Sequence, residues 1–426
     1  MIVGSNPVQL VALVAVALCA SFALFLLIRQ RPRWAMALWA AALFFTPVWL
    51  GANVPGLFVT ALTAVTLLCI AAGIAPGLRW SVADTIMLVL LAVLLLGYVI
   101  GGAAPGHIQQ SLLTWFLPYI WGRMVLARTS EDWVAVCISV AAGVAAVLAI
   151  VEFATGRNVF LSFPGNPGVW GTLQIRGGEL RVEGAFGHSI ALGGSLAMSA
   201  AFVLTVRWPA WVRASFLVVI GIATTLTFSR LGIVGYALTV VLTLALLGRY
   251  LTTTFRVALV SIFAVGSAIA VPLLLDVFGA AGAEAEGSAG YRLDLTSLLS
   301  AMVMIGVSPS REVLATGEDY WGSFRSIDSA LILIGLRFGI VCLAVVLLLL
   351  ALLVATTFTK HATPAGVALV AQIPAFATVA LITQYASFVW FAAGLAVASY
   401  TLRAGQADQA RSYDDVAPAL DVMGAK

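Results

Sequence analysis

The stretch from Thr85 to Gly102 reads TIMLVLLAVLLLGYVIGG and contains no charged side chain. A run of about 20 apolar residues is the length that an α-helix needs to cross the hydrocarbon core of a bilayer. Three further runs have the same character: Val8–Ile28, Leu57–Ala75 and Val257–Leu275. These runs predict the fold class, an all-α polytopic membrane protein.

The composition of the whole chain agrees with that class. Of its 426 residues, 62% are hydrophobic and 9% are charged, and the mean hydropathy is +1.08. Soluble domains contain about 25% charged residues, so a large soluble enzyme is excluded. The basic residues are spread over short loops, which argues against a nucleic-acid partner. The four cysteines lie in apolar runs without metal-ligand spacing, so no metal site or disulfide framework is expected.

Apolar runs and the polar residues between them predict about 13 spans, within a range of 11 to 14. We place them at 8–28, 34–50, 57–76, 85–103, 111–127, 134–154, 190–206, 214–229, 231–248, 257–278, 329–354, 365–384 and 387–402. The chain then divides into N-terminal helices (1–154), an outer loop (155–189), central helices (190–278), a long outer loop (279–328), C-terminal helices (329–402) and a cytoplasmic, disordered tail (403–426).

The distribution of Lys and Arg predicts the orientation, because short cytoplasmic loops carry an excess of both. Alternate loops place 14 of the 22 basic residues inside the cell, seven outside and Arg337 within a span. The seven outer residues are Arg157, Arg176, Arg181, Arg230, Arg292, Arg311 and Arg325. So many arginines on the outer side indicate an anionic ligand there.

The most specific local motif is TLTFSRLG (225–232), in a tight hairpin between two spans. Its Arg230 lies next to the bilayer, where an unpaired arginine is costly and therefore indicates function. The alternative is an arginine that extends to the lipid headgroups and anchors a helix end.

In the long outer loop, Tyr291 and Arg292 lie at the start of an expected amphipathic surface helix (291–306). Arg325 and Asp328 lie at the end of the loop. Guanidinium groups bind phosphate oxygens in pairs, so these arginines suit a diphosphate. Asp328 is a candidate general base, or alternatively the cap of the helix that begins near residue 329.

A further group, Arg181, Glu183 and His188, precedes the span 190–206. Glu183 is a second candidate base or simply an ion-pair partner of Arg181, and His188 is more typical of a helix entry than of a catalyst. Arg337 is expected to face the bundle interior, because a lipid-facing arginine is costly. His107 lies in a short loop and indicates no site.

Four motifs in this order resemble the O-antigen ligase and Wzy-type polysaccharide polymerase superfamily of bacterial envelopes. They are RVEGAFGH (181–188), TFSRLG (227–232), YR (291–292) followed by MIGVSP (304–309), and SIDS (326–329) followed by IGLRFGI (334–340). The resemblance covers about residues 175–350 and does not involve the first 150.

The resemblance implies a GT-C-like membrane glycosyltransferase of the bacterial inner membrane that works at its outer face without metal, nucleotide or other cofactor. Its partners would be a polyprenyl-pyrophosphate-linked glycan donor, a glycan acceptor, the lipid bilayer and a chain-length regulator. Arg230 and Arg292 would correspond to the arginines that hold the donor diphosphate, with Arg181 or Arg325 as further contacts. Asp328 stands where ligases commonly have a histidine, which favours a polymerase of O-antigen or exopolysaccharide over a ligase.

Two alternatives stay open at this point. The first is an O-antigen ligase, which transfers the lipid-linked glycan to an envelope acceptor. The second is a flippase for lipid-linked oligosaccharides or another transporter. A flippase needs cations through the bundle, whereas this chain places them at one face, and no internal repeat typical of transporters is visible.

Overall fold

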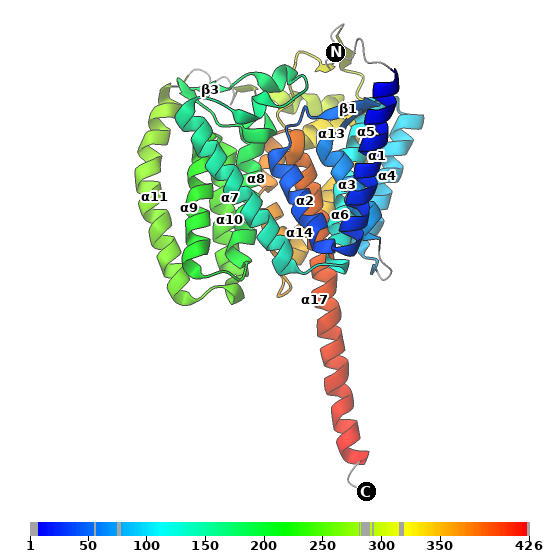
Figure 1. The fold of residues 1–426 in the computed structure, drawn as a ribbon, viewed down its shortest axis with the longest axis vertical. Coiled ribbons are helices and arrows are strands. Elements are labelled where there is room, and N and C mark those ends of the chain that lie inside the picture. Colours follow the sequence, from blue (N-terminus) through cyan, green and yellow to red (C-terminus); the bar gives the residue numbers. More distant parts are fainter. Residues whose placement is uncertain are drawn as a thin grey trace.

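The chain folds into a bundle of α-helices with three short β-hairpins at one end (Figure 1). The computed structural model describes residues 7–54, 57–74, 78–280, 282, 290–291, 294–314 and 319–423, with side chains described from residue 19 to residue 406. The helices are α1 (Pro7–Gln30), α2 (Pro32–Phe45), α3 (Ala61–Gly73), α4 (Val82–Val99), α5 (Pro105–Ser111), α6 (Leu117–Met124), α7 (Glu131–Thr155), α8 (Ser189–Thr205), α9 (Ala210–Leu226), α10 (Arg230–Leu246), α11 (Thr253–Ala280), α13 (Ala330–Phe338), α14 (Ile340–Thr357), α15 (Pro364–Val370), α16 (Ile373–Thr378) and α17 (Thr383–Met423). The antiparallel hairpins pair β1 (Gly51–Val54) with β2 (Leu57–Thr60), β3 (Ile175–Arg176) with β4 (Glu179–Leu180), and β5 (Arg311–Val313) with β6 (Asp319–Trp321).

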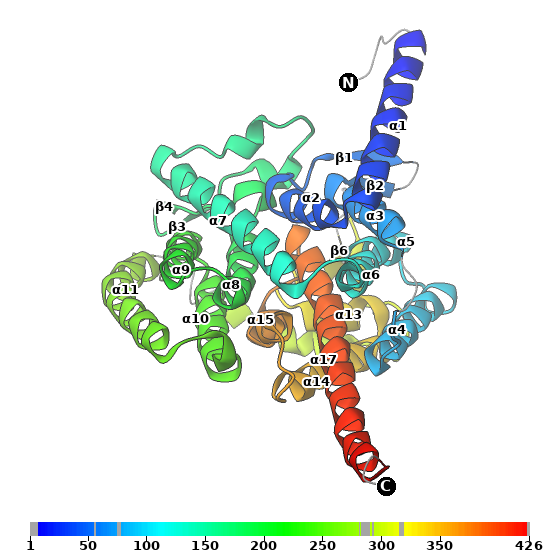
Figure 2. The ribbon, with the colours of Figure 1, turned by 60° about the horizontal axis from the view of Figure 1, so that its bottom comes forward.

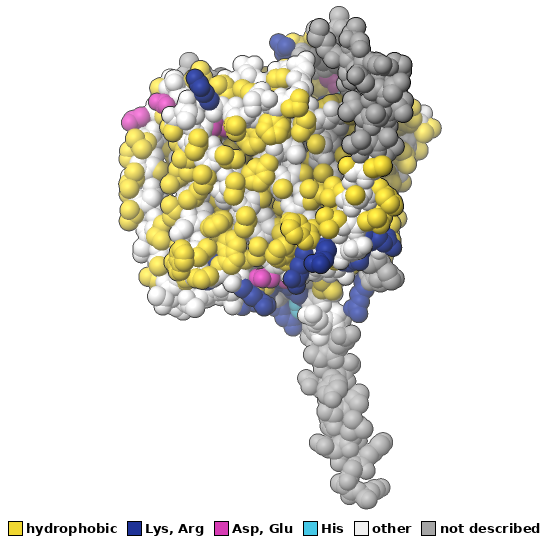
Figure 3. Space-filling view, in the orientation of Figure 1, with side chains coloured by type: hydrophobic (Ala, Val, Ile, Leu, Met, Phe, Trp, Pro, Cys, Tyr) yellow, Lys and Arg dark blue, Asp and Glu magenta, His cyan; other side chains and the backbone are white. Residues whose placement is uncertain are grey.

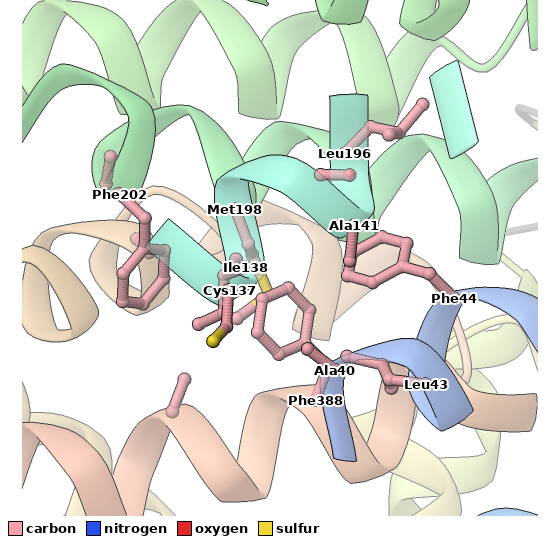
Figure 4. Close-up of a cluster of buried hydrophobic side chains, with 14 of the residues drawn as sticks. Ala40, Leu43, Phe44, Cys137, Ile138, Ala141, Leu196, Met198, Phe202 and Phe388 are labelled. Carbon is pink, nitrogen blue, oxygen red and sulfur yellow. The ribbon is translucent and has the colours of Figure 1, made fainter. Parts of the chain in front are cut away.

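The core forms around α8, which is buried along almost its whole length. A helix that is apolar on every side must be enclosed by others, and α7, α9, α10, α15 and α17 pack against α8. Figure 4 shows part of this core, where Phe44 of α2, Ile138 of α7 and Phe202 of α8 converge on Phe388 of α17. Figure 2 shows α17 in the middle of the bundle, with α7 to α11 on one side and α3 to α6 on the other.

The two ends of the bundle carry different segments of the chain. We call the end that carries residues 156–188 and the described part of 290–329 the loop face, and the opposite end, from which α17 protrudes, the tail face (Figure 1). At the tail face, hydrogen bonds join loops that are distant in the sequence: Arg128 to the carbonyl of Arg29 at 3.1 Å, and Arg249 to the carbonyl of Lys360 at 2.9 Å. The loops that were assigned to one side from their basic residues therefore do lie together.

The surface between the two faces is apolar. Figure 3 shows hydrophobic side chains over the height of the bundle and Lys and Arg along its lower edge, near the exit of α17. Among the described residues, five helices are long and apolar enough to cross a membrane: Val82–Val99, Glu131–Thr155, Thr253–Ala280, Ile340–Thr357 and Thr383–Gln406. Several shorter apolar helices accompany them. The predicted class of an all-α membrane protein is thus supported, whereas the number of spans stays a prediction.

Three predicted spans are interrupted. The span 329–354 breaks into α13 and α14 at Gly339, whose φ of +92° no helix can contain. The span 111–127 contains a π-helical segment, Leu112–Phe116, directly before Pro118 at the start of α6. Proline has no N–H to donate, and a π-helical turn is one way to accommodate the missing bond. The span 365–384 divides into α15 and α16 around Gln372, followed by an extended stretch.

The structure also differs from the prediction in part of the long outer loop and in the C-terminal tail. The surface helix expected over 291–306 is replaced, in its described part, by a short 3-10 helix, Leu295–Ala301, with Leu295 and Leu298 buried. These two leucines pack with Trp321 and Leu336, so the segment is fixed to the protein rather than to the membrane surface. The tail expected to be disordered continues as helix α17 to Met423.

Candidate active site

The turn between α9 and α10 is held in a strained shape. Phe228 has a φ of +44°, a conformation that costs a non-glycine residue about 1–3 kcal/mol. The hydroxyl of Thr227 donates to the carbonyl of Thr224 at 2.6 Å and accepts from the N–H of Ser229 at 3.2 Å. The hydroxyl of Ser229 in turn accepts from the N–H of Gly232 at 3.2 Å and caps α10. The motif TFSRLG therefore folds into one fixed turn that positions Arg230.

Two arginines of the outer loop brace this turn from the side. Nε of Arg181 donates to the carbonyl of Thr227 at 3.0 Å, and Nη1 of Arg176 donates to the carbonyl of Phe228 at 2.9 Å. Arg181 is only 6% exposed. It was a candidate diphosphate ligand, and the structure places it behind the turn, where it positions the backbone of residues 227 and 228.

Arg230 is the exposed arginine of this group and forms the first residue of α10. Its guanidinium lies over the ring of Phe278 in α11, 4.7 Å from the ring centroid. The N-terminal end of a helix carries a partial positive charge, which adds to the charge of the side chain. Arg230 therefore offers a cation at the loop face, on a turn that does not need to rearrange.

Two carboxylates organise the adjacent segment. Glu152, 3% exposed, accepts hydrogen bonds from the backbone N–H groups of Glu183 and Gly184, both at 3.0 Å. Oε1 of Glu183 accepts from the N–H of Gln174 at 2.9 Å. Burial raises the pKa of Glu183 to about 8, and the nearby Glu152 adds to the rise. Glu183 therefore holds its proton near neutral pH.

His188 is the cap of α8, as its place before that span suggested. Its Nδ1 accepts from the N–H of Ile190 at 3.2 Å, and its ring meets Trp170 edge-on at 6.3 Å between centroids. Burial and the charge of Arg181 lower the pKa of His188 to about 4, so the ring is neutral.

Asp328 lies in a second group at the loop face. Its Oδ1 accepts from the hydroxyl of Ser326 at 3.1 Å, and the hydroxyl of Tyr291 donates to the carbonyl of Ser326. The expectation that Asp328 caps α13 is wrong, because the cap is Ser329, whose hydroxyl accepts from the N–H of Ile332 at 3.3 Å. Asp328 is left half-buried, and Arg325 is exposed. Arg292 lies outside the described residues.

The connection between α16 and α17 (residues 379–382) and the first two residues of α17 join the two groups. The carbonyl of Val379 accepts from the N–H of Ala330, directly after the SIDS motif, at 3.0 Å. Nε2 of Gln384 donates to the carbonyl of Ala185 at 3.2 Å, next to Glu183. Thr383, the first residue of α17, has a φ of +49°. The motifs at 181–188 and 326–329 are thus brought together by one strained connection.

A charged cluster that sequence reasoning missed lies at the same face. Nε2 of His107 is 2.7 Å from Oδ2 of Asp319, and Nε of Arg311 donates to Oδ1 of Asp319 at 2.8 Å. Arg337 points into this cluster, and its Nε is buried without a hydrogen-bond partner among the described residues. Burial, followed by the charge of Arg337, lowers the pKa of His107 to about 4, so a neutral imidazole donates to the carboxylate. Arg337 is half-buried and interacts electrostatically with Asp319 and Arg311, whereas no motif marked His107 or Asp319.

No metal-binding group of three His, Cys, Asp or Glu residues occurs in the part of the chain that the structure describes. The arrangement instead offers arginines, two buried carboxylates and one half-buried aspartate, a set suited to binding an anion and moving a proton. No protein-family model and no curated protein matches this chain.

Proposed function

We propose that the protein is a membrane glycosyltransferase that transfers or polymerises glycans carried on a polyprenyl diphosphate. The observation that supports this most is the exposed Arg230 at the first position of α10, on a turn fixed by Arg176 and Arg181. A fixed cation at the end of an apolar bundle suits a ligand whose charge lies at the membrane surface and whose tail lies in lipid.

The diphosphate would bind through Arg230, with Arg292 and Arg325 as additional ligands from the long loop. Arginine can form two parallel hydrogen bonds to phosphate oxygens and stays charged at any relevant pH. In this structure Phe278 occupies one side of Arg230. Since a cation–π contact at an exposed site contributes about 0.5–1 kcal/mol, a doubly charged phosphate competes with it readily.

In the proposed reaction, a hydroxyl of the acceptor attacks the anomeric carbon of the donor. The new bond joins that oxygen to the anomeric carbon, and the bond to the diphosphate breaks, so the polyprenyl diphosphate leaves. Asp328 accepts the hydroxyl proton, because it is more exposed than Glu183, which is 1% exposed. Glu183 has a structural role, because its side chain accepts a hydrogen bond from the backbone N–H of Gln174. Preorganised cations near the leaving group commonly supply the largest part of such an acceleration.

This proposal places the loop face on the outer side of a bacterial cytoplasmic membrane and the tail face in the cytoplasm. The basic loops that gather at the tail face support it, because such loops stay inside. A chain-length regulator is a further proposed partner.

Deletion of the gene and electrophoresis of the envelope glycans test the proposal. Loss of long chains with single repeat units retained indicates a polymerase. Accumulation of lipid-linked polymer with a bare acceptor indicates a ligase. Unchanged glycans would overturn both.

Complementation with single variants then tests the site itself. Arg230→Ala and Arg292→Lys should restore no long chains at normal protein levels, since a lysine cannot form the paired contact. Arg157→Ala is the matched control, because Arg157 is exposed in the same face and lies outside the group. Full polymer from Arg230→Ala would contradict the role of Arg230.

A further inference from the structure

A large cavity lies between α4, α14 and α17, and its loop-face end reaches Ala330 and Leu381 beside the candidate active site. Its volume is about 540 Å³, within the range of about 300–1,000 Å³ that ligand pockets have. Its walls are almost entirely apolar and include Met87, Val346, Leu349, Trp390 and Val397. A cavity of this kind suits a hydrocarbon chain.

The two ends of the cavity differ in polarity. The end nearer the loop face is lined by Ala330, Ile334 and Leu381, none of which has a polar side chain. The tail-face end is lined by residues with hydroxyl groups: Ser81 before α4, Thr356 near the end of α14, and Tyr400 and Thr401 within α17. An amphipathic ligand would therefore place its headgroup at the tail face.

The rim at the tail face has the composition of a membrane–water boundary. Trp80 lines the cavity and is fixed by a hydrogen bond from its Nε1 to the hydroxyl of Thr85 at 2.9 Å. Tyr400 lines it from α17 and packs edge-on against His361 at 5.9 Å between centroids. Trp and Tyr are enriched at the level of lipid headgroups.

Arg79 supplies a cation at this rim. It precedes Trp80 in the chain, is exposed, and its guanidinium packs against Gly405, one helical turn beyond Thr401. Within the described residues its side chain makes no ion pair, whereas Arg403 nearby is bound to Glu131. Arg79 is thus the basic group that a phosphate at the mouth of the cavity would meet.

We propose that this cavity binds an anionic glycerophospholipid from the leaflet at the tail face, with an acyl chain in the cavity and the phosphate at Arg79. The polyprenyl donor fits less well, because its diphosphate would have to lie at the loop-face end, where the lining has no charge. This binding site does not depend on the proposed glycosyltransferase activity. The phospholipid headgroup would lie at the tail face, at the opposite end of the bundle from the candidate active site.

The experiment is native mass spectrometry of the full-length protein in detergent, titrated separately with phosphatidylglycerol, phosphatidylcholine of the same chains, and undecaprenyl phosphate. Leu349→Trp narrows the cavity with a bulky indole, and Leu348→Trp is its matched control, since Leu348 is the neighbouring residue but is 54% exposed and does not line the cavity. Arg79→Ala removes the headgroup contact, with Arg31→Ala as the control, because Arg31 is exposed at the same face away from the cavity.

The wild-type protein should retain phosphatidylglycerol in preference to phosphatidylcholine. Leu349→Trp should weaken this binding, because the indole takes space from the acyl chain. Arg79→Ala should weaken it roughly fivefold and remove the preference for the anionic lipid, which is the effect of about one basic residue at a membrane surface. Both controls should bind as the wild type does.

Three results would overturn the proposal. They are equal binding of the two phospholipids by the wild type, unchanged phosphatidylglycerol binding in Leu349→Trp, and displacement of phosphatidylglycerol by undecaprenyl phosphate at equal concentration. If Leu349→Trp does not fold, the test rests on Arg79→Ala, because Arg79 lies at the surface. Loss of the preference for phosphatidylglycerol over phosphatidylcholine in that variant would support the proposal, and an unchanged preference would overturn it. Glycan synthesis by the cells is measured separately, so failure here leaves the proposed function standing.

Discussion

His107 donates from Nε2 to Oδ2 of Asp319 at 2.7 Å and thereby joins the start of α5 to the hairpin of β5 and β6. The same carboxylate receives Arg311 at 2.8 Å. One aspartate thus holds two segments from opposite halves of the chain and balances the charges of Arg311 and Arg337.

Asp319→Asn should destabilise the protein by about 1–3 kcal/mol, because it leaves the half-buried Arg311 and Arg337 without this counter-charge. The melting temperature in detergent measures this. Asp276→Asn is the control, since Asp276 is exposed on α11, and it should melt as the wild type does. Equal melting of the two variants would show that the cluster does not stabilise the loop face.

Glu183 should make the stability depend on pH. Its pKa is raised from 4.5 to about 8, so the folded protein binds this proton more tightly than the unfolded chain does. The stabilisation is complete below about pH 4.5 and is lost as the pH rises through about 8. Glu183→Gln keeps an acceptor for Gln174 and should flatten the fall of melting temperature over that range by several degrees. Glu179→Gln, an exposed position in β4, should keep the wild-type profile.

Gly339→Ala should cost about 1–3 kcal/mol of stability, because Gly339 has a φ of +92° and a Cβ there would lie 2.7 Å from the carbonyl oxygen of Met304. Gly266→Ala is a matched control in α11, where nothing surrounds the glycine. That change should stabilise the helix by about 0.5–1 kcal/mol. Thermal unfolding of both variants gives the comparison, and a tolerated alanine at 339 would mean that the break between α13 and α14 is not required.

Substitutions at the neighbouring residues Asp328 and Ser329 should have different effects, one on glycan synthesis and the other on stability. Ser329→Ala removes the cap of α13 and should cost about 1 kcal/mol while polymer is still made. Asp328→Asn should melt normally and lose long-chain polymer, because Asp328 is proposed to accept the proton. Normal polymer from Asp328→Asn would transfer the role of base to another group.

The features that could be predicted from the sequence are those recorded in local composition. Apolar runs predicted the helical membrane class, and the spacing of basic residues predicted which loops lie together at the tail face. The motifs 181–188 and 227–232 were singled out separately, and the hydrogen bond from Arg181 to Thr227 joins them.

The features that could not be predicted depend on partners distant in the chain. Continuous apolar runs do not reveal that Gly339 ends one helix and begins another, because the break requires the approach of residues 304 and 305. His107 carried no local signal, since its partner is supplied by a hairpin far along the chain. Ser329 rather than Asp328 caps α13, and both residues are good caps, so composition alone could not distinguish them.

Helix α17 runs without a break from Gln384, which binds the carbonyls of Thr46 and Ala185 at the loop face, to Tyr400 and Thr401 at the mouth of the cavity. At 1.5 Å per residue these ends are about 24 Å apart. Because a helix has a fixed length, an axial displacement of its tail-face end would move Gln384 by the same amount. The loop face and the tail face are therefore connected by a single helix of the fold.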